Sequence, residues 1–212
     1  VIEKENQKAV IRYVSTNGNR VLTTDEVTGK SGEAIAYSTT SQITEFKKQG
    51  YNLVSDEFTS GGAKVYDYDT ARDQVYTVTL SERVEPVNPD NPTPQPNTPV
   101  NPGQPDSPRW PASVHDLDNK ESVSRTIHYV YEDGSKAKDD VVETLNFKRW
   151  SRINLVTGQI FFQDWTTNDD TFDKVVSPTI AGYTADKSEI PAVSGVKAKD
   201  QDRVETVTYR KE

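Results

Sequence analysis

Prolines crowd the middle of this chain and restrict its fold more than any other feature of the sequence. Ten of the twelve prolines lie between Pro86 and Pro111, most of them two or three residues apart. Each proline holds φ near about −65°, biases the preceding residue toward extended conformations and lacks an amide donor, which excludes helix and central strand. Residues 85–111 are therefore predicted to form an extended, polyproline-II-like linker, on the order of 80 Å long when fully stretched.

The residues of the linker also bear on its role and on where it contacts a domain. A recognition motif for an SH3-type partner is the alternative to a spacer, but most of these prolines have no basic residue beside them to anchor such a partner. Arg109, Trp110 and Pro111 are the natural place for the linker to dock on a domain.

The sequences on either side of the linker carry the same pattern. Three landmarks occur twice in the same order: AVIRYVSTNGNRV from Ala9 and RTIHYVYEDGSKA from Arg125, QGYNL from Gln49 and AGYTA from Ala181, DQVYTVTL from Asp73 and DRVETVTY from Asp202. This alignment places Tyr13 on Tyr129. The second copy has about 16 extra residues before its Gly-Tyr pair, by the spacing in the sequence.

Each copy begins and ends with alternating apolar residues, which predict half-buried strands. Asn17-Gly18 and Asp133-Gly134 supply the positive φ of tight hairpin turns. In the first copy, Ser and Thr at 38–41, Ile43 and Phe46 on one side, and Gly50 predict a capped helix.

The second copy instead carries RINLVTGQIFFQDW from Arg152, which predicts an extra hairpin around Thr157-Gly158. A short helical turn at Asp170–Val175 is also compatible with the sequence. We therefore expect an α+β, mainly β chain with two related β-grasp (ubiquitin-like) domains in tandem, elongated and joined by the Pro-rich linker. The expected domains are residues 1–84 with one helix and 112–212 with the extra hairpin near 146–170, on either side of linker 85–111.

Composition excludes several classes of function. Residues 1–84, 85–111 and 112–212 are each acidic, and the net charge of the chain is −8. No basic cluster favours nucleic acid or an anionic membrane surface, and no apolar run approaches the roughly 18 residues of a membrane-spanning helix. The absence of cysteine removes disulfides, thiol nucleophiles and Cys-ligated zinc. The sequence opens without a signal peptide, which we interpret as the start of an excised piece of a longer protein.

The landmarks of the second copy identify a family resemblance. Tyr129-Val130 with Gly134, Gly182-Tyr183 and the closing Thr206-Val207-Thr208-Tyr209 resemble the mucus-binding repeats (Mub and MucBP type) of surface proteins from lactobacilli and related Gram-positive bacteria. Residues 123–210 fit apart from the insertion near 146–170, and residues 9–80 fit the companion domain, with Leu80 where its last Tyr would stand.

The resemblance implies a repeat unit of an extracellular adhesin that binds host mucin glycoproteins. The adhesin would be anchored to the bacterial cell wall through the rest of the parent protein, and we expect a monomer within a longer repeat array. Immunoglobulin binding through an exposed β edge and a purely structural spacer are the alternatives that the sequence leaves open.

Catalysis and metal binding find little support in the residues. The two histidines, His115 and His128, lie at the end of the linker and on a strand face where the first copy has Arg12. No catalytic or phosphate-binding motif appears, so we predict no enzyme activity and no cofactor. Residues 164–175 resemble a calcium loop only faintly, because Asp169 occupies the position of the required Gly and Val175 that of the Glu. We predict no metal site, although a calcium site of another design stays open.

Glycan recognition uses aromatic platforms flanked by polar side chains, and the inserted hairpin is rich in both. The predicted ligand-binding residues are Trp150, Arg152, Asn154, Phe161, Gln163 and Trp165. Strand alternation would place Phe161, Gln163 and Trp165 on one face. The competing interpretation is that these aromatics cap the core of the domain.

Overall fold

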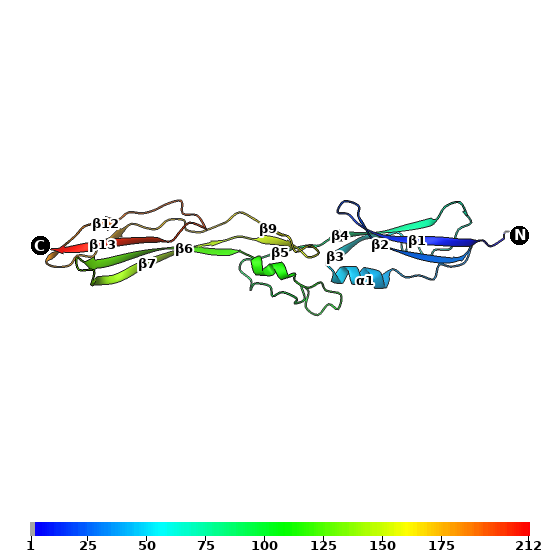
Figure 1. The fold of residues 1–212 in the computed structure, drawn as a ribbon, viewed down its shortest axis with the longest axis horizontal. Helices are drawn as coiled ribbons and strands as arrows, with labels where there is room; N and C mark the ends of the chain where they lie inside the picture. The colour runs from blue at the N-terminus through cyan, green and yellow to red at the C-terminus, as the bar shows by residue number, and fades with distance from the viewer. Residues whose placement is uncertain (1–2) are drawn as a thin grey trace. The chain divides into compact units, whose positions relative to one another are not determined.

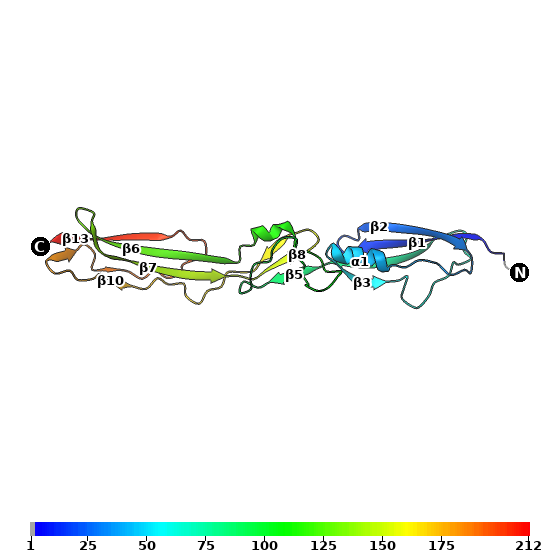
Figure 2. The ribbon, with the colours of Figure 1, turned by 90° about the horizontal axis from the view of Figure 1, so that it is seen from below.

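The computed structural model describes residues 3–212, and each strand and helix below lies within that range. The strands are β1 (Asn6–Ser15), β2 (Val21–Lys30), β3 (Tyr51–Asp56), β4 (Gln74–Glu82), β5 (Val84–Val87), β6 (Lys120–Tyr131), β7 (Lys136–Lys148), β8 (Ser151–Asn154), β9 (Ile160–Phe162), β10 (Val175–Val176), β11 (Tyr183–Ala185), β12 (Glu189–Ile190) and β13 (Arg203–Lys211). The helices are α1 (Thr40–Lys48) and the 3-10 helix η1 (Ala112–Asp116). The fold is mainly β, with two domains in tandem (Figures 1 and 2).

The chain divides into two compact units whose boundaries differ from the expected domains. Unit 1 comprises the chain up to Val87 together with Pro92–Leu117 and Arg152–Phe161. Unit 2 comprises Asn88–Asn91, Asp118–Ser151 and Phe162–Glu212. Most of the inserted hairpin thus belongs to unit 1, although the sequence places it within the second copy of the pattern.

Unit 1 is built on a four-stranded sheet in the order β2-β1-β4-β3. The two central strands, β1 and β4, are parallel, with Tyr13 opposite Val78. Helix α1 covers this sheet, as predicted, and buries Ile43 and Phe46 in its core. The helix is followed by Gly50, whose φ of 106° is a conformation that side chains disfavour.

Unit 2 repeats this arrangement in its own sheet, in the order β11-β13-β6-β7. Strands β6 and β13 are parallel, and Tyr129 lies opposite Val207. Because the alignment of the two copies pairs Tyr13 with Tyr129 and Val78 with Val207, the two central ladders have the same register. The repeated pattern in the sequence thus marks a repeated sheet.

The cover of the second sheet is extended chain in place of a helix. β10 pairs with β12, and Phe172 bridges Val193, so the compatible helical turn at 170–175 is not formed. Both covering segments are held by Arg125 of β6, whose side chain is 1% exposed. Its Nη1 donates to the carbonyl of Pro191 at 2.9 Å, and its Nη2 donates to the carbonyl of Asp173.

Arg125 has further partners that compensate its buried charge. Its Nη2 lies 3.6 Å from Oε2 of Glu143, and its guanidinium lies 5.2 Å from the centre of the Phe172 ring. A buried cation is tolerated when it is paired and hydrogen-bonded. One arginine therefore joins the centre of the sheet to both segments that cover it.

The proline-rich segment is folded back on itself, which corrects the expected extended spacer. Pro99 bridges Arg109, and Trp110 exchanges 2.9 Å backbone hydrogen bonds with Asn97 and Thr98. The amides that donate these hydrogen bonds belong to residues between the prolines, so the lack of an N–H on each proline removes none of these bonds. Within unit 1, Trp110 packs on a small apolar cluster, as its predicted docking role requires; the cluster contains Val87, Val114, Ile153 and Leu155.

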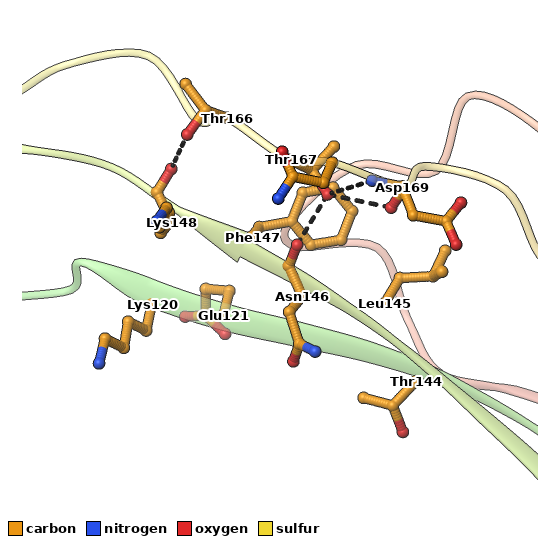
Figure 3. Close-up of a pocket in the computed structure, with 11 residues that line it drawn as sticks. Lys120, Glu121, Thr144, Leu145, Asn146, Phe147, Lys148, Thr166, Thr167 and Asp169 are labelled. Carbon is orange, nitrogen blue, oxygen red and sulfur yellow. Dashed lines mark hydrogen bonds between the residues drawn. The ribbon is translucent and has the colours of Figure 1, made fainter. Parts of the chain in front are cut away.

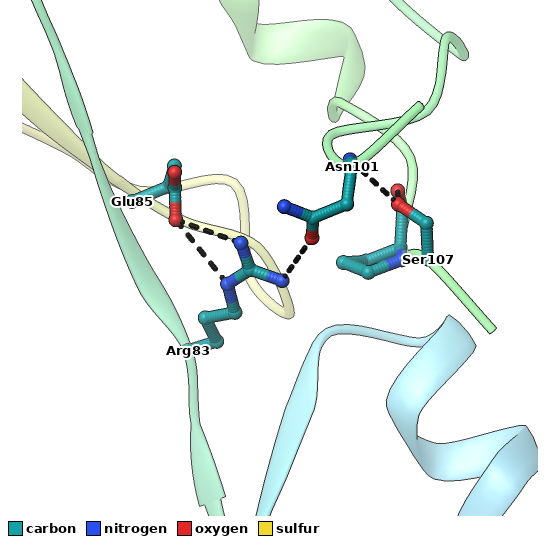
Figure 4. Close-up of polar contacts among 5 residues, drawn as sticks. Arg83, Glu85, Asn101 and Ser107 are labelled. Atoms are coloured by element: carbon teal, nitrogen blue, oxygen red, sulfur yellow. Dashed lines mark hydrogen bonds and ion pairs between the residues drawn. The ribbon is translucent and has the colours of Figure 1, made fainter. Parts of the chain in front are cut away.

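Polar contacts hold the same loop to unit 1 (Figure 4). The Arg83 guanidinium donates to Oε2 of Glu85 at 3.2 and 3.0 Å, and to Oδ1 of Asn101 at 2.7 Å. The amide of Asn101 in turn donates to Oγ of Ser107 at 2.8 Å. The sequence could not reveal this folding, because the partners of the loop come from β5 and from the hairpin formed by β8 and β9.

Candidate functional site

The six predicted ligand-binding residues are divided between the units. Arg152, Asn154 and Phe161 belong to unit 1, and Trp150, Gln163 and Trp165 belong to unit 2. Trp150 and Phe161 are 43% and 45% exposed. Because β9 ends at Phe162, the strand alternation expected to carry Gln163 and Trp165 onto the face of Phe161 does not continue that far.

Asn154 uses its side chain within unit 1. Its Nδ2 donates to Oε2 of Glu82 at 2.8 Å, and its Oδ1 accepts the amides of Val156 and Thr157 at 2.9 and 3.1 Å. Hydrogen bonds from Asn17 and Asn154 lower the pKa of Glu82 below its ordinary value of 4.5. Asn154 thus shapes the hairpin turn and joins it to the end of β4.

Trp165 also has a structural partner, within unit 2. The Arg149 guanidinium lies between two rings, 3.8 Å from the centre of Phe162 and 4.1 Å from that of Trp165. Asp118 fixes the arginine through two hydrogen bonds. Nε of Arg149 donates to the backbone carbonyl of Asp118 at 2.8 Å, and Nη2 donates to its carboxylate at 3.3 Å. One face of Trp165 is thereby occupied, which leaves Trp150 as the more exposed tryptophan of the inserted region.

A groove of about 550 Å³ lies in unit 2, close to these residues in the sequence. It is lined by Lys120, Glu121, Thr144, Leu145, Asn146, Phe147, Lys148, Thr166, Thr167, Asn168 and Asp169. Figure 3 shows the segment Thr166–Asp169 lying alongside β7, with Lys120 and Glu121 on the neighbouring β6. Its volume falls within the range of about 300–1,000 Å³ typical of ligand pockets.

Hydrogen bonds fix the wall of this groove. Lys148 and Thr166 exchange backbone bonds of 3.0 and 2.8 Å. The hydroxyl of Thr167 donates to the carbonyl of Asn146 at 2.7 Å, and the amide of Asp169 donates to that hydroxyl at 3.2 Å. Polar groups held in this way are preorganised, which reduces the entropy lost on binding.

Two lysines in or near the groove form ion pairs. Nζ of Lys148 lies 2.9 Å from Oδ1 of Asp90, and Nζ of Lys199 lies 2.7 Å from Oδ2 of Asp118. Burial opposes ionisation of Asp118, but the hydrogen bond and charge of Lys199 outweigh it and lower its pKa. The hydrogen bond and negative charge of Asp118 raise the pKa of Glu121. The lining therefore combines neutral hydrogen-bonding groups with two basic and two acidic side chains, Lys120, Lys148, Glu121 and Asp169.

Neither a membrane-spanning helix nor a cluster of metal-binding side chains occurs in residues 3–212. No helix in residues 3–212 is both long enough and apolar enough to span a membrane. Within the same range, no three His, Asp or Glu side chains gather as a candidate metal site. Asp170, from the segment compared with a calcium loop, accepts the hydroxyl of Thr171 at 2.9 Å.

Comparisons with known proteins give a family match for each half of the chain. Residues 7–82 match the family model of a mucin binding domain, and residues 114–212 match that of a Muc B2-like domain. The type 2 repeat of the mucus binding protein MUB from Lactobacillus reuteri is 27% identical, with a TM-score of 0.61, over 97% of this chain and 100% of that one. The chain is a mucus-binding protein repeat.

A second solved structure supports the same fold for this mucus-binding repeat. The crystal structure of Mub-RV is 25% identical, with a TM-score of 0.75, over 97% of this chain and 99% of that one. No curated protein matches the chain.

Sequence reasoning about this repeat missed the groove. Its lining residues come from three stretches, Lys120 and Glu121 of β6, 144–148 of β7, and 166–169, with about 20 residues of chain between one stretch and the next. The run Thr166-Thr167-Asn168-Asp169 is dense in short hydrogen-bonding side chains and was the available signal. By itself this run predicts only a polar turn, because the sequence does not show which strand it lies against.

Proposed function

We propose that this mucus-binding repeat is part of a cell-surface adhesin and holds host mucin glycoproteins by binding, without catalysis. The observation that carries the proposal is the match over the full length of a MUB repeat whose protein is named for binding mucus. The two histidines support a binding role over catalysis. His115 is exposed, and Nδ1 of His128 lies 2.9 Å from Oδ1 of Asp140 in a surface pair.

The proposed contact residues of the adhesin are the aromatic and polar side chains of the predicted ligand-binding set. We propose Trp150, Gln163 and Trp165 in unit 2, and Arg152 and Phe161 in unit 1, as direct contacts. Asn154 contributes by shaping the hairpin that carries Arg152 and Phe161. Trp150 and Phe161 have the largest open aromatic surface of this set and are the first to substitute.

We further propose that both sheets descend from the β-grasp arrangement. In unit 1, a helix follows a hairpin, and the first and last strands are parallel neighbours at the centre of a mixed sheet. The parent protein would be anchored to the wall of a Gram-positive bacterium, with this repeat acting as a monomer within an array. The organism of the MUB relative supports that setting.

Adhesion of the purified chain to immobilised mucin tests the proposal. We expect saturable binding that is lost when the O-linked glycans are stripped, and a several-fold loss in Trp150→Ala or Phe161→Ala. Val176→Ala is a matched control, since Val176 is 66% exposed and lies outside the proposed contact set. Absence of binding at any mucin density would refute the adhesin function for the isolated repeat.

Protein binding through a strand edge is the second candidate, with immunoglobulins as the notable partner. It is favoured by the edge position of β2 in its sheet. An edge strand offers unpaired amides and carbonyls to an incoming strand. Equal binding to deglycosylated mucin or to immunoglobulin would support this candidate, whereas loss of binding with the glycans supports the first.

A further inference from the structure

The edge of β7 along the groove carries backbone groups that point away from the sheet. Lys148 directs both its N–H and its C=O outward, because both bond to Thr166. The pairing of β6 with β7 is regular from Lys148 to Val141, and successive residues of an antiparallel strand alternate in direction. Asn146, Thr144 and Val142 therefore also direct their backbone groups outward.

Some of these outward groups are already used, and others are open. The carbonyl of Asn146 accepts the hydroxyl of Thr167. Within residues 3–212, no hydrogen bond is recorded for the amide of Asn146 or for the outward amide and carbonyl of Thr144. Asn146 and Thr144 both line the groove, so their open backbone groups lie at its wall.

An extended peptide fits this edge poorly. The segment Thr166–Asp169 already bonds both backbone groups of Lys148 and the carbonyl of Asn146, which interrupts the ladder that an added strand would need. Beyond the groove, the start of β7 reads KAKDDVV from Lys136, with four exposed charged residues. Charges of this kind are a common protection of edge strands against pairing.

A small amide group fits the same edge well. An acetamido substituent carries one N–H and one C=O, as a peptide group does. Because these two groups of a trans amide point in opposite directions, its C=O can accept the open amide of Asn146 while its N–H points away from the edge. The two lysines of the lining, Lys120 and Lys148, are balanced in number by Glu121 and Asp169, and Lys148 is also paired with Asp90, so the groove has no excess of basic charge to select an anionic sugar. Hydroxyls of the sugar ring would meet the side chains of Thr144, Asn146 and Asn168.

We propose that the groove between β7 and Thr166–Asp169 binds a neutral N-acetylated hexosamine of the glycan, through the open backbone edge at Asn146 and Thr144. This inference rests on the proposed function, because it assigns a sugar class to part of the mucin contact. It differs from the aromatic contacts in depending on backbone groups.

Titration of the whole chain with N-acetylgalactosamine, followed by NMR of backbone amides, tests the inference. Galactose is the matched sugar without an acetamido group. We expect N-acetylgalactosamine to shift the amides of Thr144 and Asn146, with little response to galactose. Equal responses to the two sugars, or no response to N-acetylgalactosamine, would overturn the inference.

Substitution separates the backbone from the side chain. Asn146→Pro removes the open amide, Asn146→Ala keeps it, and Val142→Pro removes an outward amide of the same edge outside the groove. Proline is tolerated where an edge amide faces solvent. We expect about tenfold weaker binding of N-acetylgalactosamine to Asn146→Pro alone, the loss of one good hydrogen bond.

The outcomes for the groove and for adhesion are distinguishable. Binding to Asn146→Pro as tight as to Val142→Pro would overturn the role of the backbone edge. If Asn146→Pro proves unfolded by its amide spectrum, the contrast between the two sugars on the unsubstituted chain still decides. Mucin adhesion without any sugar response in the groove would refute this inference alone, and a sugar response without mucin adhesion would refute the adhesin function alone.

Discussion

In unit 1 the sheet is covered by helix α1, whose Ile43 and Phe46 enter the core, whereas in unit 2 the equivalent sheet is covered by two extended segments held by Arg125. The position equivalent to Arg125 in unit 1 is Ala9, which is fully buried. The small residue leaves room for the helix, and the large one reaches the backbone of a cover that has no helix.

A second contrast concerns the paired tyrosines at the centre of each sheet. The hydroxyl of Tyr13 donates to that of Tyr37 at 2.6 Å, and Tyr37 donates to Asp25 at 2.5 Å. The hydroxyl of Tyr129 is buried and has no partner within residues 3–212. The shared strand pattern thus specifies the sheet, and the residues between the landmarks specify how each sheet is covered.

The largest effect is expected from removing the arginine that holds the cover of unit 2. Arg125→Ala leaves two carbonyls and Glu143 without their buried partner, and should cost about 3–5 kcal/mol of the stability of unit 2. Hydrogen exchange of β6 and β13 amides measures this loss. Amides of β1 and β4 should be unaffected, and equal losses in both units would contradict the assignment of Arg125 to one cover.

Substituting the aligned glycines Gly50 and Gly182 compares how closely other chain segments pack at the same position of the two units. Both have positive φ, but a Cβ on Gly50 would lie 2.7 Å from the backbone carbon of Leu155, whereas one on Gly182 meets nothing within 4 Å. We expect Gly50→Ala to cost about 3 kcal/mol and Gly182→Ala about 1 kcal/mol. Denaturant titration of each variant compares them, and equal costs would mean that the hairpin does not pack on Gly50.

Removing the hydroxyl of the central tyrosine should have a different effect on stability in each unit, and both effects should be smaller than those above. Tyr13→Phe breaks the bond to Tyr37 and should cost about 1 kcal/mol. Tyr129→Phe removes a buried hydroxyl without a partner and should be neutral or slightly stabilising. Thermal unfolding of the two single variants checks this difference, which would disappear if an internal water satisfies Tyr129.

The smallest effect is a pH dependence of unit 1. Hydrogen bonds from Asn17 and Asn154 lower the pKa of Glu82 below its ordinary value of 4.5. The ionised carboxylate therefore contributes its full stabilisation above pH 4.5. This stabilisation is lost as the pH falls through the lowered pKa. Asn154→Ala should raise this pKa and weaken the acid sensitivity. Stability measured from pH 6 to 3 tests the change, and an unchanged profile would contradict it.

The repeated strands and the helix could be predicted from the sequence because they depend on local pattern. The alternation around Tyr13 and Tyr129 is enough to specify the strands, and Ile43, Phe46 and Gly50 specify the helix and its end. The turn at Thr157-Gly158 likewise predicted the hairpin of β8 and β9.

The features that escaped prediction depend on residues far apart in the sequence. Arg125 bonds to carbonyls 48 and 66 residues away, which no window of sequence reveals. The proline-rich loop folds because Trp110 and Val114 find Ile153 and Leu155. Of the candidate site, Trp150 and Phe161 are exposed, and their role as ligand contacts stays a prediction. The groove depends on a loop packing against a strand edge, which sequence pattern alone does not reveal.

In each unit, the first and last strands of the sheet, β1 with β4 and β6 with β13, are parallel neighbours. Tension applied to the ends of such a sheet slides these strands along one another, so that many hydrogen bonds resist at once. An antiparallel pair pulled from its open end would instead lose its bonds one after another. Each unit is therefore built to resist stretching, which suits the adhesive role proposed for the chain.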